Sequence, residues 1–297
     1  MGHISAKVAK KLIEKGFVTG VCLKPTSFGE PYFCESCIYA KATREPIPKV
    51  RDGEWATKFG KEIYTDLWGP APVATKGGKK YYIIFTDDMS RLTHLYLICA
   101  KSDTFATYKE YKALCKTQLD ANIKIIHSDR GGEYLDKEFM LYLKKQGTDQ
   151  KLTVHDTASQ NGIAEHHNCT IVECICALLH ASGLLRILWG EAAHHIVRLM
   201  NRTSTRAVKG MTPYEAMFGK KPNLKDVWEW GEKVWVRIEG GNKLGGRVCE
   251  GRWMGINEQS KGICIYWPDK MMVGVEQNVY YDKTVASFSH LEGRMRK

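Results

Sequence analysis

The chain has 297 residues, of which 43% are hydrophobic, so it is long enough for roughly two domains of about 150 residues with buried cores. This composition excludes a disordered protein, and no apolar run reaches the roughly 18 residues that a membrane helix requires. The 44 Lys and Arg against 33 Asp and Glu give a net charge of +11, which favours a polyanionic partner such as nucleic acid. A basic protein without such a partner is the alternative.

Residues 1–51 form the first predicted unit, which contains a helical pattern at 6–15 and the pair Cys34 and Cys37. Two thiolates in a C-x2-C turn are typical of a zinc site, which needs two further N or S ligands. His3 is the third candidate, and Cys22 or water is left for the fourth. Alternatively the pair is incidental, because ten cysteines without an apolar leader indicate an intracellular, reducing setting.

Residues 52–225 form the second predicted unit, in which strands and helices alternate. Strands are expected at 61–66, 81–87, 93–99, 123–128 and 150–155, and helices at 102–120, 136–146, 160–182 and 189–201. The first three strands should form an antiparallel meander, whereas the strands joined through helices should be parallel. The pattern predicts an α/β fold with a mixed five-stranded sheet and flanking helices.

Three acidic residues stand out in this unit. Asp66 and Asp129 each follow a strand-like run, and Glu165 opens a predicted helix. A phosphoryl-transfer site with two divalent cations needs carboxylates from several elements, because hard cations prefer oxygen ligands. We therefore expect the three carboxylates to meet at one site, although a triple drawn from 33 acidic residues is a weak signal by itself.

Other features of this unit carry secondary expectations. An apolar stripe that includes Ala164, Ile171 and Ile175 should pack on the sheet, which leaves Glu165 facing a cleft. Asp87 and Asp88 either form a second acidic site or simply end a strand. The sequence Thr-Pro-Tyr-Glu after Met211 predicts a capped short helix that opens at Pro213.

Residues 226–297 form the third predicted unit, with short β-type runs at 233–238, 251–256, 262–267 and 273–281. This texture predicts a small β-barrel. Its basic residues would suit nucleic acid. Most of its aromatic residues, Trp235, Trp253, Tyr266 and Trp267, are expected to fill the small core.

Several ordered motifs resemble one family over nearly the whole chain. The segments YTDLWGP, YYIIFTDDMSR, HSDRGGEY, SQNGIAE and TPYEAMFGKKP resemble the integrase of Ty1/copia-class LTR retrotransposons, and CESCIYAKATREP resembles its pre-integrase zinc segment. The resemblance implies an RNase H-like core between a truncated zinc segment and an SH3-like module. It also implies that Asp66, Asp129 and Glu165 are catalytic and hold two Mg²⁺ or Mn²⁺ ions.

The implied activity is the joining of DNA 3′-OH ends to target double-stranded DNA in one in-line phosphoryl transfer. Gly131 and Gly132 would let the backbone approach phosphate, because no Cβ obstructs it. Gln160 and Asn161 would bond to DNA near the scissile phosphodiester, unless they only form the turn before the helix. The family further implies a homo-oligomer that acts in the nucleus, with a cytoplasmic virus-like particle as its earlier location.

The sequence departs from the family pattern at three points. The family's zinc site has two His and two Cys, and no counterpart of its first His precedes His3, so either the sequence is a fragment of a longer polyprotein or the site is broken. His166 and Cys169 stand where arginine is usual, which suggests a decayed copy. The alternatives are a catalytically silent nucleic-acid-binding relic and an RNase H-type nuclease, although such a nuclease needs neither the zinc segment nor the β module.

Overall fold

The computed structural model describes residues 55–152, 162–237, 247–257, 260 and 262–281. The chain divides into two compact units, Met1–Asp52 and Gly53–Lys297, and all of the described residues belong to the second. The expected zinc ligands His3, Cys34 and Cys37 lie outside the described residues, as do the expected DNA-contact residues Gln160 and Asn161.

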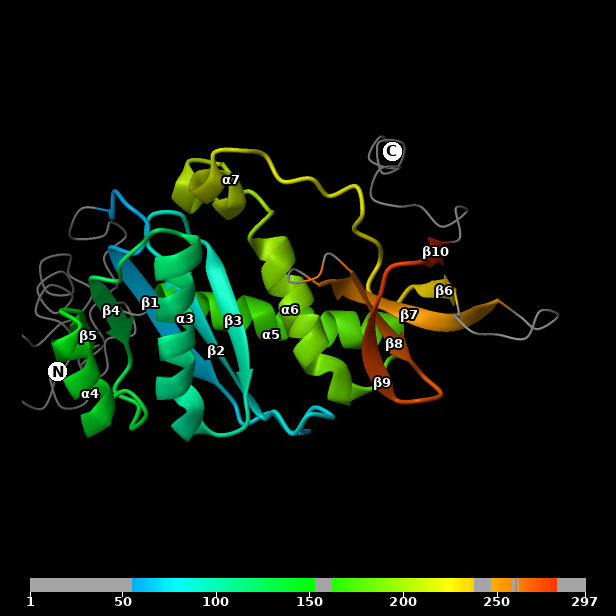
Figure 1. Cartoon of the computed structure of the whole chain (residues 1–297), viewed down its shortest axis with the longest axis horizontal. Helices are drawn as coiled ribbons and strands as arrows, with labels where there is room; N and C mark the ends of the chain where they lie inside the picture. Colours follow the sequence, from blue (N-terminus) through cyan, green and yellow to red (C-terminus); the bar gives the residue numbers. More distant parts are fainter. Residues whose placement is uncertain (1–54, 153–161, 238–246, 258–259, 261, 282–297) are drawn as a thin grey trace, which may run out of the picture. The chain divides into compact units, whose positions relative to one another are not determined.

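The first sheet of the second unit has five strands in the order β3-β2-β1-β4-β5 (Figure 1). The strands are β1 (Glu62–Trp68), β2 (Tyr81–Asp87), β3 (Thr93–Ile98), β4 (Ile125–Ser128) and β5 (Asp149–Leu152). β1, β2 and β3 pair antiparallel, whereas β4 is parallel to both β1 and β5. The predicted RNase H-like α/β class, with its antiparallel meander and parallel extension, is confirmed.

Helices cover both faces of this sheet. One face packs against α3 (Thr104–Gln118) and α4 (Lys137–Lys145), and the other against α5 (Gly162–Ser182) and α6 (Trp189–Met200). The short helix α7 (Pro213–Phe218) follows in the chain. Three short 3₁₀ turns, at Lys101–Asp103, Arg206–Val208 and Arg186–Leu188, complete the described helical structure. None of the described helices is both long enough and apolar enough to cross a membrane.

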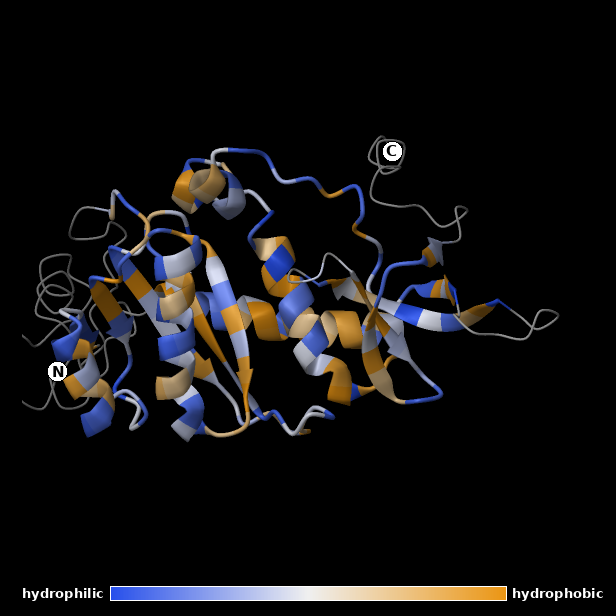
Figure 2. Ribbon diagram, in the orientation of Figure 1, coloured by the Kyte–Doolittle hydropathy of each residue, from blue (hydrophilic) through white to orange (hydrophobic). Residues whose placement is uncertain are grey.

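Neighbouring residues of a strand belong to two different hydrophobic clusters, one on each face of the sheet, because side chains alternate between the two faces of a strand. Ile63 of β1 packs with Tyr108 and Phe139 from α3 and α4. Tyr64 packs with Ile171 and other residues of α5 and α6 in the second cluster. Apolar residues, drawn orange in Figure 2, mark the packed faces of α5 and α6. This burial on both faces explains why β2 has a nearly continuous apolar sequence.

Local sequence signals set where two of the helices begin. The Asp136 carboxylate accepts hydrogen bonds from the N–H groups of Glu138 and Phe139 at 3.0 and 3.2 Å, which caps α4. At α7 the Thr212 hydroxyl accepts a bond from Glu215 N–H at 3.0 Å, and Pro213 occupies the first turn. The helix predicted to open at Pro213 is therefore confirmed.

The C-terminal part of the described chain forms a second, wholly antiparallel sheet of order β10-β6-β7-β8-β9. Its strands are β6 (Lys233–Arg237), β7 (Val248–Ile256), β8 (Ile263–Trp267), β9 (Met272–Glu276) and β10 (Val279–Tyr281). The module of short strands is confirmed. The single strand-like run expected at 273–281 is wrong, because it breaks into β9 and β10, which lie on opposite edges of the sheet.

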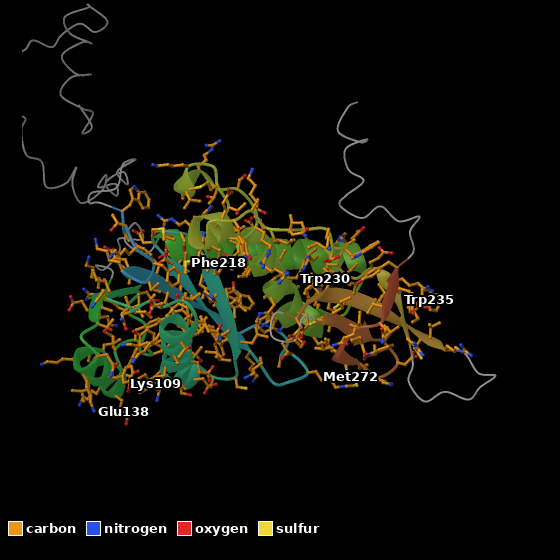
Figure 3. All side chains as sticks on the ribbon, turned by 45° about the horizontal axis from the view of Figure 1, so that its top comes forward. Lys109, Glu138, Phe218, Trp230, Trp235 and Met272 are labelled. Carbon is orange, nitrogen blue, oxygen red and sulfur yellow. The ribbon has the colours of Figure 1, made fainter. Side chains whose placement is uncertain are left out.

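The aromatic residues of this sheet divide between its core and its surface. Trp253 and Tyr266 are buried, as expected of residues that fill a small core. Trp235, labelled in Figure 3, is 39% exposed and carries the Lys233 ammonium 4.6 Å from its ring centroid. Closure of the sheet into an SH3-like barrel stays a prediction, because the described strands show no pairing of β9 with β10.

The second sheet packs directly against helices of the first. Trp230, Met254 and Tyr266 are buried in one cluster with Trp189 and Ile196 of α6. The Lys76 ammonium also donates a hydrogen bond to the Lys270 carbonyl at 3.1 Å. Gly53–Lys297 accordingly behaves as one compact unit. The boundaries that the sequence predicts at 51/52 and 225/226 stay predictions.

Candidate active site

Asp66 and Asp129 occupy matching positions on two neighbouring parallel strands. β1 and β4 are aligned so that Tyr64 lies opposite His127. Two residues further along lie Asp66, inside β1, and Asp129, the residue that follows β4. Because side chains alternate between faces, residues two positions beyond an aligned pair point to the same face as that pair. Continued by two residues, this register brings Asp129 near Asp66, and the charge of Asp129 acts on the Asp66 carboxylate.

Contacts just ahead of the two acids tie the strands together. The rings of Tyr64 and His127 stack with centroids 4.3 Å apart and planes 14° from parallel. His127 Nε2 lies 2.9 Å from the Glu62 Oε2 atom, and both side chains are nearly buried. On the opposite face, the hydroxyls of Thr65 and Tyr134 are hydrogen-bonded at 3.1 Å. The backbone below the acids is thus held from both sides of the sheet.

Helix α5 brings Glu165 and Asn168 to the same place. Glu165 lies in the first turn of the helix and is partly buried, and Asn168 follows three residues later on the same side. The Asn168 Nδ2 atom donates a hydrogen bond to Asp66 Oδ2 at 2.7 Å. The second oxygen of Asp66 accepts a bond from Leu67 N–H at 3.0 Å. One helix and one strand are therefore joined at the Asp66 carboxylate.

The negative charges of the three acids affect one another's pKa values. Burial raises the pKa of Asp66 to about 6, the Asn168 hydrogen bond opposes that rise, and the charges of Asp129 and Glu165 add to it. The pKa of Glu165 is also raised, first by burial and then by the charge of Asp129. This mutual repulsion is the electrostatic setting that a bound cation relieves.

The carboxylates do not form a closed ligand cage. Within the described residues, no three His, Cys, Asp or Glu side chains are close enough together to hold one metal ion. Asp129 Oδ1 instead accepts a hydrogen bond from Gly131 N–H at 2.9 Å. The structure thus brings the three predicted residues into one electrostatic neighbourhood without metal-ligand geometry.

The donor set nevertheless fits a hard divalent cation. All three acids offer carboxylate oxygens, which Mg²⁺ and Mn²⁺ prefer over nitrogen or sulfur ligands. The carbonyl oxygen of Asn168 and the hydroxyl of Tyr82 are buried without a hydrogen-bond partner among the described residues. Burial and the charge of Asp66 raise the pKa of Tyr82, so its hydroxyl remains protonated beside the acids.

Hydrogen bonds to nearby backbone and side-chain groups explain why two acidic residues, Asp87 and Asp88, lie at buried positions. Asp87 accepts bonds from Gly60 N–H and from both the N–H and the hydroxyl of Ser90, each at 2.8 Å. Asp88 accepts a bond from Ala56 N–H at 2.9 Å and forms an ion pair with Arg91 at 3.3 Å. Both acids are buried. They anchor the segment before β1 and the β2–β3 turn, which favours the structural interpretation over a second metal site.

The other positions singled out from the sequence differ in their surroundings. A Cβ added at Gly131 would lie 2.8 Å from the Glu133 carboxyl carbon, whereas one at Gly132 would meet nothing within 4 Å. Gly132 thus presents open backbone near Asp129, and its role toward phosphate stays a prediction. His166 and Cys169, at which the family resemblance implies arginine, are both exposed on α5.

Sequence reasoning missed three polar residues whose side chains contact distant parts of the chain. Asn168 sits on the apolar stripe of α5, where an isolated polar residue was the available signal. His167 lies within 3.1 Å of the Thr93 hydroxyl and 3.3 Å of the Thr86 hydroxyl. Asn201 both accepts from Thr93 N–H at 2.9 Å and donates to Thr93 C=O at 2.8 Å. These last contacts join residues distant in sequence, and no local pattern indicates them.

Comparison with known proteins gives matches along most of the chain. Residues 57–158 match the family described as Integrase core domain. The Retrovirus-related Pol polyprotein from transposon TNT 1-94 of Nicotiana tabacum is 27% identical over 286 residues, which are 95% of this chain and 21% of the relative. The corresponding polyprotein from transposon RE2 of Arabidopsis thaliana is 27% identical over 259 residues, or 86% of this chain and 17% of the relative.

The chain therefore spans about a fifth of the length of these curated relatives. Among solved structures, the cryoEM structure of the simian T-cell lymphotropic virus intasome in complex with PP2A regulatory subunit B56 gamma contains a similar chain. That chain has 14% sequence identity and a TM-score of 0.48, and the match covers 84% of this chain and 87% of the other. This similarity is too low to add to what the sheet topology already shows.

Proposed function

We propose that the protein is a retrotransposon integrase, because residues 57–158 match the family described as Integrase core domain and the chain is similar to plant copia-type Pol polyproteins. It would join DNA 3′-OH ends of the element to target double-stranded DNA. One observation carries this proposal. The pairing of β1 with β4 brings Asp129, the residue after β4, near Asp66, and α5 brings Glu165 into the same electrostatic neighbourhood.

In this proposal Asp66, Asp129 and Glu165 hold divalent cations, Mg²⁺ or Mn²⁺. A cation bound there would activate the attacking hydroxyl and stabilise the departing phosphodiester oxygen. The chain's own contribution is placement. Two hydrogen bonds fix the Asp66 carboxylate, and the paired strands keep Asp129 beside it. Gly132 leaves room for a phosphate to approach the backbone after Asp129.

Further parts of the proposal rest on the family alone. Zinc would be held by His3, Cys34 and Cys37, with the fourth ligand open, and DNA near the cleaved bond would contact Gln160 and Asn161. We also propose a homo-oligomer that grips two DNA ends and acts in the nucleus after an earlier stage in a cytoplasmic virus-like particle. The +11 charge supports a polyanionic partner.

The direct test is strand transfer of a labelled DNA end into a plasmid with Mg²⁺ or Mn²⁺. Wild type should join the ends, Asp129→Asn should not, and the exposed Asp269→Asn should behave as wild type. Absence of joining by wild type, with salt-sensitive DNA binding intact, would contradict the proposal and favour the silent DNA-binding relic. Cleavage of an RNA–DNA hybrid without any joining would favour the nuclease.

A further inference from the structure

The outer face of α3 carries a row of three lysines. Lys109, Lys112 and Lys116 recur at intervals of three and four residues, so they share one side of the helix over about 10 Å of its length. Within the described part of the chain, none of the three forms an ion pair with a carboxylate. The only acidic residue of α3, Glu110, lines a groove beside β3 instead. Together the three residues form what we term the lysine row.

Aromatic side chains hold two members of the lysine row in place. The Lys109 ammonium lies 4.2 Å from the centroid of the Phe105 ring, and the Lys112 ammonium lies 5.6 Å from that of Tyr142. Lys112 also donates a hydrogen bond to the Thr148 hydroxyl at 3.3 Å. A lysine side chain that binds a partner loses much of its rotamer freedom. These contacts reduce that cost, because two of the ammonium groups are already ordered.

The positive charges of the lysine row repel one another. Lys112 and Lys116 are four residues apart, a spacing at which like charges destabilise a helix. The pKa of Lys112 is lowered, first by burial and then by the charge of Lys116. Stability of the fold therefore does not explain the row, whereas a bound polyanion would relieve the repulsion.

We propose that the lysine row is a docking surface for the phosphate backbone of duplex DNA, separate from the site of the three acids. Lysine ammonium groups bind phosphates as point charges and do not read base sequence. Each strand of a duplex places one phosphate about every 3.4 Å along the helix axis, so the roughly 10 Å of the row spans about three phosphates.

The surroundings of the lysine row favour phosphate over a protein partner. The rings of Phe105 and Tyr142 are partly buried and lie against the ammonium groups. A partner therefore meets positive charge on this face of α3 rather than an apolar pocket. Protein segments depend on apolar or aromatic anchors that fill such pockets, whereas a phosphate backbone depends on charge.

The lysine row lies on the side of the sheet opposite to the helix that carries Glu165. α3 and α4 pack in one hydrophobic cluster on one face, and α5 and α6 pack in another on the other face (Figure 1). The chain would thus hold a second duplex segment on the side away from α5. The inference goes beyond the proposed function, because docking on the row requires neither the metal ions nor the acids.

The test measures how tightly the whole chain binds a labelled DNA duplex, by fluorescence anisotropy in EDTA over a range of KCl concentrations. Replacing all three lysines of the row with Gln should make the slope of log K against log[KCl] shallower by about 2.7, because each phosphate contact contributes about 0.9. Lys116→Gln, which keeps both ring contacts of the row, should make it shallower by about 0.9. An unchanged slope in the triple variant would overturn the proposal, and the single variant gives the same answer if the triple variant does not fold.

A matched control removes the same charge from other parts of the chain. Lys58, Lys124 and Lys220 are exposed and lie on three separate segments. Their joint replacement with Gln should change the slope by less than about 0.9, the value of one phosphate contact. A control that loses as much as the α3 variant would show that only net charge matters, and the docking surface would be ruled out.

Two further probes identify what the lysine row binds. Replacing its three lysines with Arg keeps the charge and should keep the wild-type slope for duplex DNA. Poly-glutamate should displace the duplex from wild type only poorly. If poly-glutamate instead displaces the duplex efficiently and no longer binds the triple Gln variant, the partner is an acidic peptide and the assignment to DNA is wrong.

These measurements separate the two proposals. If wild type joins DNA ends while the triple Gln variant binds the duplex with the wild-type slope, the proposed function stands and the docking surface fails. If the slope changes as expected while wild type joins no ends, the docking surface stands and the proposed function fails.

Discussion

The imidazole of His195 on α6 meets the indole of Trp253 on β7 edge-on, with ring centroids 5.3 Å apart and planes at 88°. Both side chains are buried, and together they join a helix of the first sheet to a strand of the second. Burial, followed by the nearby charge of Arg198, lowers the pKa of His195 to about 4. The contact between the sheets therefore holds a histidine that is neutral at pH 7.

This histidine should make the free energy of unfolding depend on pH. Its pKa is about 4 in the folded chain against 6.5 for an ordinary histidine, so between these values the unfolded chain binds more protons. Stability is fully present above pH 6.5 and falls as the pH drops toward 4. The contribution of His195 to the free energy of unfolding that is lost over this range is about 3 kcal/mol. Burial also lowers the pKa of His167 to about 4, and His167 is present in both proteins. Denaturant unfolding over this range should therefore show a loss about 3 kcal/mol larger in wild type than in His195→Phe, and parallel curves would contradict the prediction.

The amide of Asn201 should contribute measurably to stability, because it ties the end of α6 to β3 through two hydrogen bonds with the Thr93 backbone. Asn201→Ala leaves those backbone groups without partners and should cost about 1–3 kcal/mol in urea unfolding. The exposed Asn122→Ala is the control and should stay within about 0.5 kcal/mol of wild type. An equally small effect in both variants would show that the two hydrogen bonds of Asn201 add little to stability.

Asp87 should contribute to the stability of the fold and not to the binding of metal ions. Its carboxylate accepts three hydrogen bonds in a buried site, so Asp87→Ala should lower the free energy of unfolding by at least about 2 kcal/mol. The Mn²⁺ affinity of the folded variant should equal that of wild type. A drop in Mn²⁺ affinity, measured by calorimetry below the melting temperature, would restore the metal-binding interpretation of this acid.

Two glycines with positive φ should respond differently to alanine. Gly69 has φ 129°, and a Cβ there would lie 2.8 Å from the Lys80 carbonyl oxygen and 2.6 Å from the Tyr81 ring. Gly78 has φ 74° with nothing within 4 Å of the added carbon. Gly78→Ala should cost about 1 kcal/mol from backbone strain, and Gly69→Ala at least about 3 kcal/mol from strain plus the clash. Equal losses in urea unfolding would rule out the close approach at Gly69.

The elements of the core were predictable because its strands and helices carry strong periodic patterns. The strand expected at 81–87 has those bounds, and the helix expected at 160–182 is observed from Gly162 to Ser182. The sequence also indicated the three acids, but it placed Asp66 at a strand end, whereas β1 continues to Trp68. The strand extends further because Leu67 and Trp68 continue the antiparallel pairing with β2.

Tertiary contacts limited what the sequence could show. The bond from Asn168 to Asp66 spans 102 residues, and the pairing of β1 with β4 joins strands that β2, β3 and α3 separate in the chain. The division of 273–281 into β9 and β10 had a local signal in Gln277 and Asn278, since Asn is frequent in turns.

The central claim is that Asp66 and Asp129 belong to one cation site. Calorimetric titration of Mn²⁺ into wild type, Asp66→Asn, Asp129→Asn and the double variant tests it most directly. The account predicts that each single change weakens binding strongly and that the double variant is hardly worse than either one, because the two carboxylates act together. Unchanged Mn²⁺ affinity in either single variant, or two independent losses that simply add, would contradict a shared site.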